Sequence, residues 1–177
     1  MKSSRQWLPV LTVVFLLPTT ATFSADPRDL DKLAKLRQST LTLRLDLSNT
    51  DLRKYPFIPG KIDLQQANLS RSNLSGVDLS KMNLGGADLS YADLSNAKLN
   101  QVNLTGANLS HANLTGTEMV QSDLSRANLT CAILNQANLS KSTFAEANIS
   151  GASFVNTVTT DIVGYNSVSD GNVECSS

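Results

Sequence analysis

The stretch ADLSYADLSNAKLNQVNLTGANLSHANLTG, residues 87–116, places a leucine at every fifth position six times in succession. An α-helix turns by about 100° per residue, so leucines five apart would encircle it and form no apolar face. A flat strand alternates its side chains, so an odd period would send successive leucines to opposite faces. The period of five therefore predicts a chain that bends once in every five residues.

This five-residue pattern runs without a gap from residue 62 to residue 156, which makes 19 units. If the repeat leucine is position i, that position is Leu in 15 units, and position i−2 is Ala, Ser, Thr or Val in 17. Side chains at i and i−2 of a short extended segment point the same way, so they are predicted to fill the interior. The polar positions i+1 and i+2 then form the turn. Such a chain winds into a solenoid whose coils stack about 4.8 Å apart.

The units ADLSY, ADLSN, ANLSH, ANLTG and ANLSK resemble the A(D/N)LXX consensus of the pentapeptide repeat family. The resemblance is close over residues 62–156 and looser over residues 45–59. It implies an all-β solenoid, namely the right-handed quadrilateral β-helix of that family, with four units to a coil. Equivalent positions of every fourth unit would then lie above one another in successive coils.

A covering element is expected at the N-terminal end, because the end coils of a solenoid expose apolar surface. Residues 26–44 predict a short capping helix followed by an entry strand, with Asp26 as the N-cap and Pro27 at the first helical position. The alternating sequence LTLRLDL, residues 41–47, predicts a short strand that leads into the first coil.

Two further boundaries are visible in the spacing of the apolar residues. Leu64 follows Phe57 by seven residues instead of five, so about two residues are inserted in a loop near residues 58–60. The motif ends at Asn156, which gives a β-helix over 45–156 and a C-terminal cap and tail over 157–177.

Residues 1–25 are typical of an export signal. Lys2 and Arg5 precede an apolar run from residue 7 to residue 18, which is too short to span a ~30 Å hydrocarbon layer. Small residues follow, and cleavage is predicted between residues 21 and 25. We therefore expect an exported protein without stable membrane insertion after cleavage. An uncleaved anchor is the alternative.

The charges of the chain bear on nucleic-acid binding. Lys and Arg together number 15, as do Asp and Glu, so the chain lacks the basic excess that binds phosphates. Some pentapeptide repeat proteins protect DNA gyrase with a strongly acidic β-helix that resembles duplex DNA. Here the repeat region carries seven acidic and five basic residues, and an export signal would separate the protein from gyrase. A gyrase-interacting DNA mimic is therefore the disfavoured alternative.

Catalytic motifs are absent from the sequence. His111 is the only histidine, the chain contains no Gly-rich phosphate loop or CxxC, and acids such as Asp88 and Asp93 simply follow the repeat. We expect no catalytic residues, no cofactor and no metal. The favoured function is a non-enzymatic structural or protein-interaction module with an unknown protein or cell-envelope partner. The resemblance implies a periplasmic or thylakoid-lumen location, with secretion as an alternative.

The four-unit register selects one surface edge as the candidate interaction site. Position i+2 of successive coils there combines a guanidinium, a phenol, an imidazole and a thiol, whereas the other three edges carry plainer residues. Tyr and Arg are enriched in interface hot spots. We call this set the corner stripe: Arg71, Tyr91, His111 and Cys131, followed by Gly151. The alternative is that i+2 tolerates any residue and the combination carries no function.

The two cysteines leave two alternatives open. Cys131 is expected to face outward at i+2, and Cys175 lies far along the chain in the predicted tail. In an oxidising compartment a disulfide would pin the tail along the side of the β-helix. Otherwise both thiols are free, and the neighbouring imidazole of His111 would favour a reactive Cys131 thiolate.

The same register makes a prediction about charge. Asp78, Lys98 and Glu118 occupy position i−1 in every fourth unit. We expect them to lie above one another on one face with alternating sign.

Overall fold

The computed structural model describes residues 45–164 and Cys175. The chain divides into two compact units, Met1–Thr40 and Leu41–Ser177, and the described residues all belong to the second. The predicted signal peptide and capping helix, up to residue 44, lie outside the described residues.

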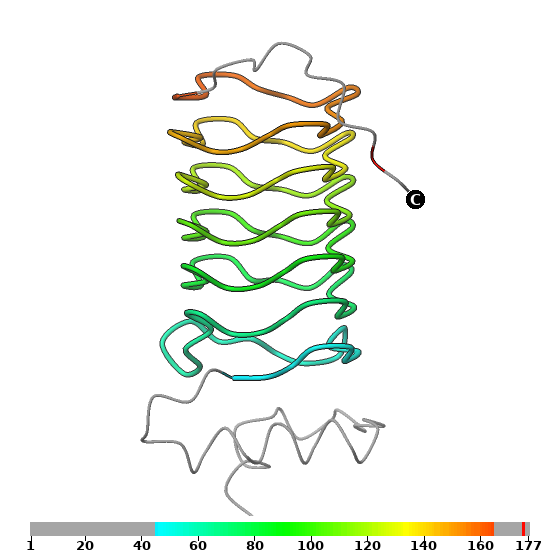
Figure 1. The fold of residues 1–177 in the computed structure, drawn as a ribbon. Coiled ribbons are helices and arrows are strands. Elements are labelled where there is room, and N and C mark those ends of the chain that lie inside the picture. The colour runs from blue at the N-terminus through cyan, green and yellow to red at the C-terminus, as the bar shows by residue number, and fades with distance from the viewer. Residues whose placement is uncertain (1–44, 165–174, 176–177) are drawn as a thin grey trace, which may run out of the picture. The chain divides into compact units, whose positions relative to one another are not determined.

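The described part of the chain is a stack of coils (Figure 1) that contains no α-helix and no strand longer than a single bridge. Within it, eighteen isolated parallel bridges join each coil to the next. The chain turns every five residues, so each flat segment is too short to form a longer ladder. The predicted all-β solenoid is therefore confirmed. Of the expected strand over 41–47, the described part shows only the bridge of Asp46 to Asn68. Within residues 45–164 there is also no helix capable of crossing a membrane.

The bridges fix the register of the coils. Asn68 pairs with Asp88 and Asp88 with Asn108, so each bridge joins equivalent positions of units four apart, and four units complete a coil, as predicted. The first coil is longer, because Asp46 pairs with Asn68, two positions beyond the regular interval. The two extra positions confirm the insertion expected near 58–60.

Leucines fill the interior from one end of the stack to the other. Leu104 at position i and Ala107 at the next i−2 position are both 0% exposed, and the same holds for most of their equivalents. Burial of one leucine side chain contributes about 1.5–3 kcal/mol, so the column of leucines is the main stabilising feature. Where serine replaces alanine at i−2, its hydroxyl donates to a backbone carbonyl of the same coil or of the preceding one. Ser72, for example, donates to the carbonyl of Leu69 at 2.7 Å.

Each corner is a tight turn formed by positions i+1 and i+2. The N–H of Ala92 donates to the carbonyl of Leu89 at 3.1 Å, and Tyr91 between them has φ +58°. These are features of a type II turn, whose third residue must adopt the left-handed conformation. A residue with a side chain adopts that conformation at a cost. A second hydrogen bond holds it here, because the N–H of Tyr91 donates to the carbonyl of Ser110 in the next coil at 3.0 Å.

The solenoid continues beyond the predicted end at Asn156. Val158 and Val163 both form parallel bridges to the preceding coil. The predicted boundary was wrong because the expected leucine is absent from position i there, where Thr159 and Gly164 stand instead. Pairing between coils uses backbone groups and does not require that side chain.

Candidate functional site

The corner stripe lies at one corner of four successive coils. Arg71, Tyr91, His111 and Cys131 have φ angles of 57°, 58°, 58° and 57°. The backbone N–H of each donates to a carbonyl of the following coil at 2.9–3.0 Å. Because the backbone is the same at each level, the side chains leave the corner in parallel directions.

Three of the four side chains form a continuous stack. The guanidinium carbon of Arg71 lies 5.1 Å from the centroid of the Tyr91 ring. The rings of Tyr91 and His111 are parallel to within 1°, with their centroids 4.7 Å apart, which matches the spacing of the coils. Arg71 and His111 belong to the coils before and after Tyr91, so they cover its two faces. Tyr91 is still 52% exposed.

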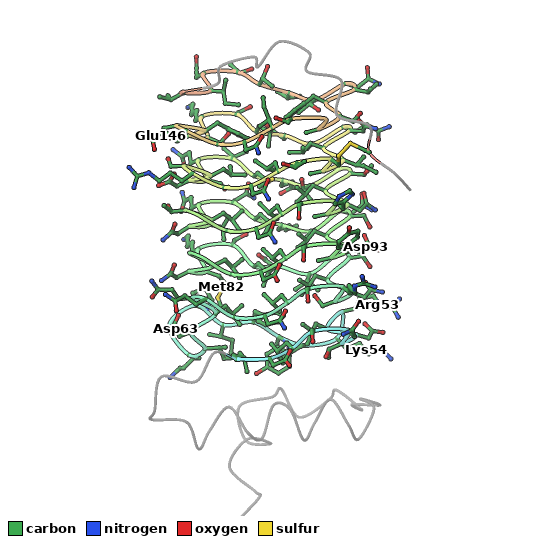
Figure 2. The ribbon with its side chains drawn as sticks, viewed as in Figure 1. Arg53, Lys54, Asp63, Met82, Asp93 and Glu146 are labelled. Atoms are coloured by element: carbon green, nitrogen blue, oxygen red, sulfur yellow. A yellow bond between two sulfur atoms is a disulfide. The ribbon has the colours of Figure 1, made fainter. Side chains whose placement is uncertain are left out.

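The fourth member of the stripe is bonded to the chain's C-terminal region. Cys131 forms a disulfide with Cys175, with Cα atoms 5.6 Å apart, and Figure 2 shows it as a yellow bond at the side of the stack. Cys131 lies at the predicted corner position, but it is only 9% exposed and its sulfur is bonded to Cys175. The alternative of a reactive Cys131 thiolate is contradicted in this structure. Both cysteines take part in the disulfide, so neither has a free thiol. The Sγ of Cys175 lies 3.6 Å from the carbonyl oxygen of Gly151, which occupies the same corner one coil further on.

The sequence profile of the pentapeptide repeats matches the chain in eight copies, over residues 61–90, 87–126 and 122–158, which is more than half of its length. The chain belongs to the pentapeptide repeat family. No functionally curated protein matches it.

Several solved structures of pentapeptide repeat proteins are similar to this chain. One from the Arabidopsis thaliana thylakoid lumen is 32% identical, over 50% of this chain and 62% of its own, with a TM-score of 0.49. This chain thus spans less than two thirds of that protein. HetL from Nostoc sp. strain PCC 7120, involved in heterocyst differentiation regulation, is 23% identical over 67% and 69%, with a TM-score of 0.37. A second Nostoc protein is 32% identical over 56% and 77%, with a TM-score of 0.35.

The Asn and Asp residues at position i−1 of this pentapeptide repeat protein stabilise its turns. The Oδ1 atom of Asp88 accepts the backbone N–H of Ser90 at 3.0 Å, and Asp93 binds Ser95 in the same way. Asn108 then donates from Nδ2 to Asp88 in the preceding coil at 3.1 Å. These contacts explain why Asn and Asp recur at i−1 and give the carboxylates a structural role.

Two asparagines that sequence reasoning missed compensate for departures from this pattern. Glu118 stands at i−1 where Asn or Asp is usual, and the N–H of Val120 is bound instead by Asn100 Oδ1 of the preceding coil at 2.9 Å. In the same way, the N–H of Val155 is bound by Asn135 Oδ1 at 2.9 Å. The signal was available in the sequence. Each asparagine stands four units before a unit that lacks Asn or Asp at i−1.

The predicted charge ladder is present on one face. Asp78 bridges to Lys98, and Lys98 bridges to Glu118, which confirms that the three residues share a column. The hydroxyl and N–H of Ser80 hold the pKa of Asp78 below its usual value, and the charge of Lys98 acts in the same direction.

A second charged pair lies at another corner and was not predicted. Arg126 Nε and Glu146 Oε2 are 2.9 Å apart in successive coils, and both side chains are 70% exposed. Glu146 lies at the opposite side of the stack from the disulfide (Figure 2). The four-unit separation of the two residues would have identified the pair. Exposed ion pairs contribute little to stability, so this one has mainly a local effect.

Proposed function

We propose that this chain is an exported, non-enzymatic pentapeptide repeat protein that acts as a structural or protein-interaction module and binds its partner through the corner stripe. The partner is a protein or a cell-envelope component. The observation that carries the proposal is the continuous stack of Arg71, Tyr91 and His111 along one exposed corner.

The stack favours binding because it orders the side chains in advance. Immobilising a flexible side chain on binding costs about 0.5–1.5 kcal/mol, and Arg71 and Tyr91 are already held by their neighbours. Both faces of Tyr91 are covered, so a ligand meets the ring edge and the hydroxyl group. With the guanidinium and imidazole beside it, the stripe presents a row of hydrogen-bonding groups at intervals of one coil. Such a row suits the polar surface of a protein better than the apolar face of a sugar ring.

The side chains that could take part in catalysis already make structural contacts, which supports a non-enzymatic role. His111, the only histidine, is stacked on Tyr91, and acids such as Asp88 are bound to turn N–H groups. Among the described residues, no group of His, Cys, Asp and Glu could hold a metal ion.

The disulfide supports the export part of the proposal, because such bonds persist mainly in oxidising compartments. A periplasmic or thylakoid-lumen protein with a signal peptide over 1–25 fits this chemistry. The proposal also includes a capping helix and an entry strand over 26–44 and a right-handed quadrilateral winding of the coils.

Capture of a partner by matched variants tests the stripe. Arg71→Ser with Tyr91→Ser should abolish capture of envelope proteins by the immobilised domain. Lys81→Ser with Gln101→Ser is the control, because these residues are at i+2 of another corner in the same coils, with φ +62° and +58°. Circular dichroism verifies that both variants fold. Equal capture by the two variants would exclude the stripe as the binding surface.

Intact-mass analysis of the protein recovered from its native compartment tests export separately. We expect the mature chain to begin at one of the positions from Thr22 to Asp26, in accordance with the predicted cleavage region. Recovery of the protein with residues 7–18 still attached would favour the uncleaved anchor.

A further inference from the structure

The two cysteines of the disulfide differ in their exposure to solvent. Cys131 is 9% exposed and is held in the corner by its backbone bond to Ser150 in the next coil, at 3.0 Å. Cys175 is exposed. Thiol–disulfide exchange begins when a thiolate attacks one sulfur of the pair, and the choice of sulfur depends on access. The more exposed residue of this pair is Cys175.

We propose that Cys175 is a thiol-exchange site through which small thiols and dithiols open this bond in a fixed direction. An external thiolate attacks the Cys175 Sγ, a new S–S bond forms there, and Cys131 departs with the electron pair as a thiolate. The second thiol of a dithiol then attacks the mixed disulfide and releases Cys175. The donor leaves as its own disulfide, having supplied two electrons and two protons, and both cysteines become thiols.

The surroundings of the bond suit both products. Cys131 is at the same corner as the imidazole of His111, one coil away, and a neighbouring imidazole favours the thiolate of a departing cysteine. The sulfur of Cys175 lies 3.6 Å from the carbonyl oxygen of Gly151. In the bridged state this sulfur has no proton, but after reduction its S–H group has that carbonyl as an acceptor.

Opening the bond changes the corner stripe. In the bridged state Cys175 covers the Cys131 position, and the exposed part of the stripe ends at His111. In the reduced state Cys131 is uncovered and extends the exposed stripe by one coil. The exchange chemistry itself does not depend on the proposed partner binding, so either can fail without the other.

Brief treatment of the oxidised full chain with glutathione tests the direction of attack. The reaction is stopped with acid, remaining thiols are blocked with N-ethylmaleimide, and peptides are analysed by mass spectrometry. Glutathione should be found on Cys175 and maleimide on Cys131, with a preference of about tenfold set by the difference in access. Arg126→Ser, which alters an exposed corner away from the bond, is the control and should give the same ratio.

Three outcomes would overturn the proposal. Glutathione mainly on Cys131 would reverse the direction of attack, and an even distribution would show that exposure does not control it. A bond that forms no mixed disulfide with glutathione would be an inert structural link. If glutathione forms no mixed disulfide, resistance of the bond to dithiothreitol under native conditions would also identify it as an inert structural link.

Discussion

Replacing Asn100 with alanine removes the acceptor that binds the backbone N–H of Val120. The two groups are 2.9 Å apart and belong to successive coils. In most units this N–H is bound by Asn or Asp at i−1 of the same unit, but Glu118 occupies that position here. Glu118 is bound in turn by Asn100 Nδ2, at 3.1 Å. The substitution therefore leaves a half-buried donor without its partner and also removes an exposed contact.

The expected loss of stability follows from the burial of Val120. A buried donor left unsatisfied costs about 1–3 kcal/mol, and the lower part of this range applies because Val120 is only half-buried and water can reach it. The exposed contact to Glu118 adds a few tenths of a kcal/mol. We expect the free energy of unfolding to fall by about 1–1.5 kcal/mol. At a urea dependence of about 1–3 kcal/mol per molar, the midpoint falls by roughly 0.3–1.5 M.

Ser95→Ala is the matched control for this experiment. Ser95 is also at position i+1, but its backbone N–H is bound by Asp93, which the substitution leaves in place. Because this backbone hydrogen bond is kept, the change should alter stability by less than about 0.5 kcal/mol. If Asn100→Ala and Ser95→Ala have the same urea midpoint, cross-coil compensation by Asn100 is refuted.

Three further perturbations test the core, the charge ladder and the pH dependence. Leu104→Ala should lower the free energy of unfolding by about 2–5 kcal/mol in urea titrations, because the side chain is 0% exposed; a loss below about 1 kcal/mol would contradict its place in the core. Lys98→Glu should destabilise the chain by about 0.2–1 kcal/mol at low salt and less at high salt, since Lys98 lies between Asp78 and Glu118; an effect independent of salt would exclude a charge origin. The pKa of Asp78 is lowered in the fold by Ser80, so its contribution is present at neutral pH and is lost as the pH falls through the lowered pKa of the folded state. Ser80→Ala should reduce the drop in urea midpoint between pH 7 and pH 3, and an unchanged drop would contradict this assignment.

The sequence pattern was sufficient to predict the core, and the resemblance to the pentapeptide repeat family supplied the register of four units to a coil. A leucine every five residues is compatible with neither a straight helix nor a straight strand, so the bend, the buried positions and the turn all follow from it. The seven-residue interval before Leu64 located the inserted residues for the same reason. Once four units were assigned to each coil, the spacing of the stripe residues placed them at one corner, as the bridges show.

Other features were missed because they depend on backbone pairing or on contacts between distant residues. The coil containing Val158 and Val163 lacks the leucine signal, although its backbone still pairs. Cys131 is bonded to Cys175, a residue far along the chain, and the sequence left that bond as one of two alternatives. The role of Asn100 is visible only when its unit is aligned with the unit one coil later.

The corner position explains how a solenoid built from one repeated unit can carry a specific surface. The fold buries the side chains at i and i−2, and it binds those at i−1 to turn N–H groups, but it uses only the backbone at i+2. In the described part of the chain, sixteen residues other than glycine have positive φ, among them Arg, Tyr, His and Cys, so this position accepts varied side chains. The core requires apolar residues at the same positions of every unit. The stacking of Arg71 on Tyr91 and of Tyr91 on His111 requires in addition that these three residues lie four units apart. Insertion of a single five-residue unit between two stripe residues would preserve the core pattern and still move the later ones to another corner. The repeat itself does not require the stripe residues to be aligned. The corner stripe is therefore the first surface to test for partner binding.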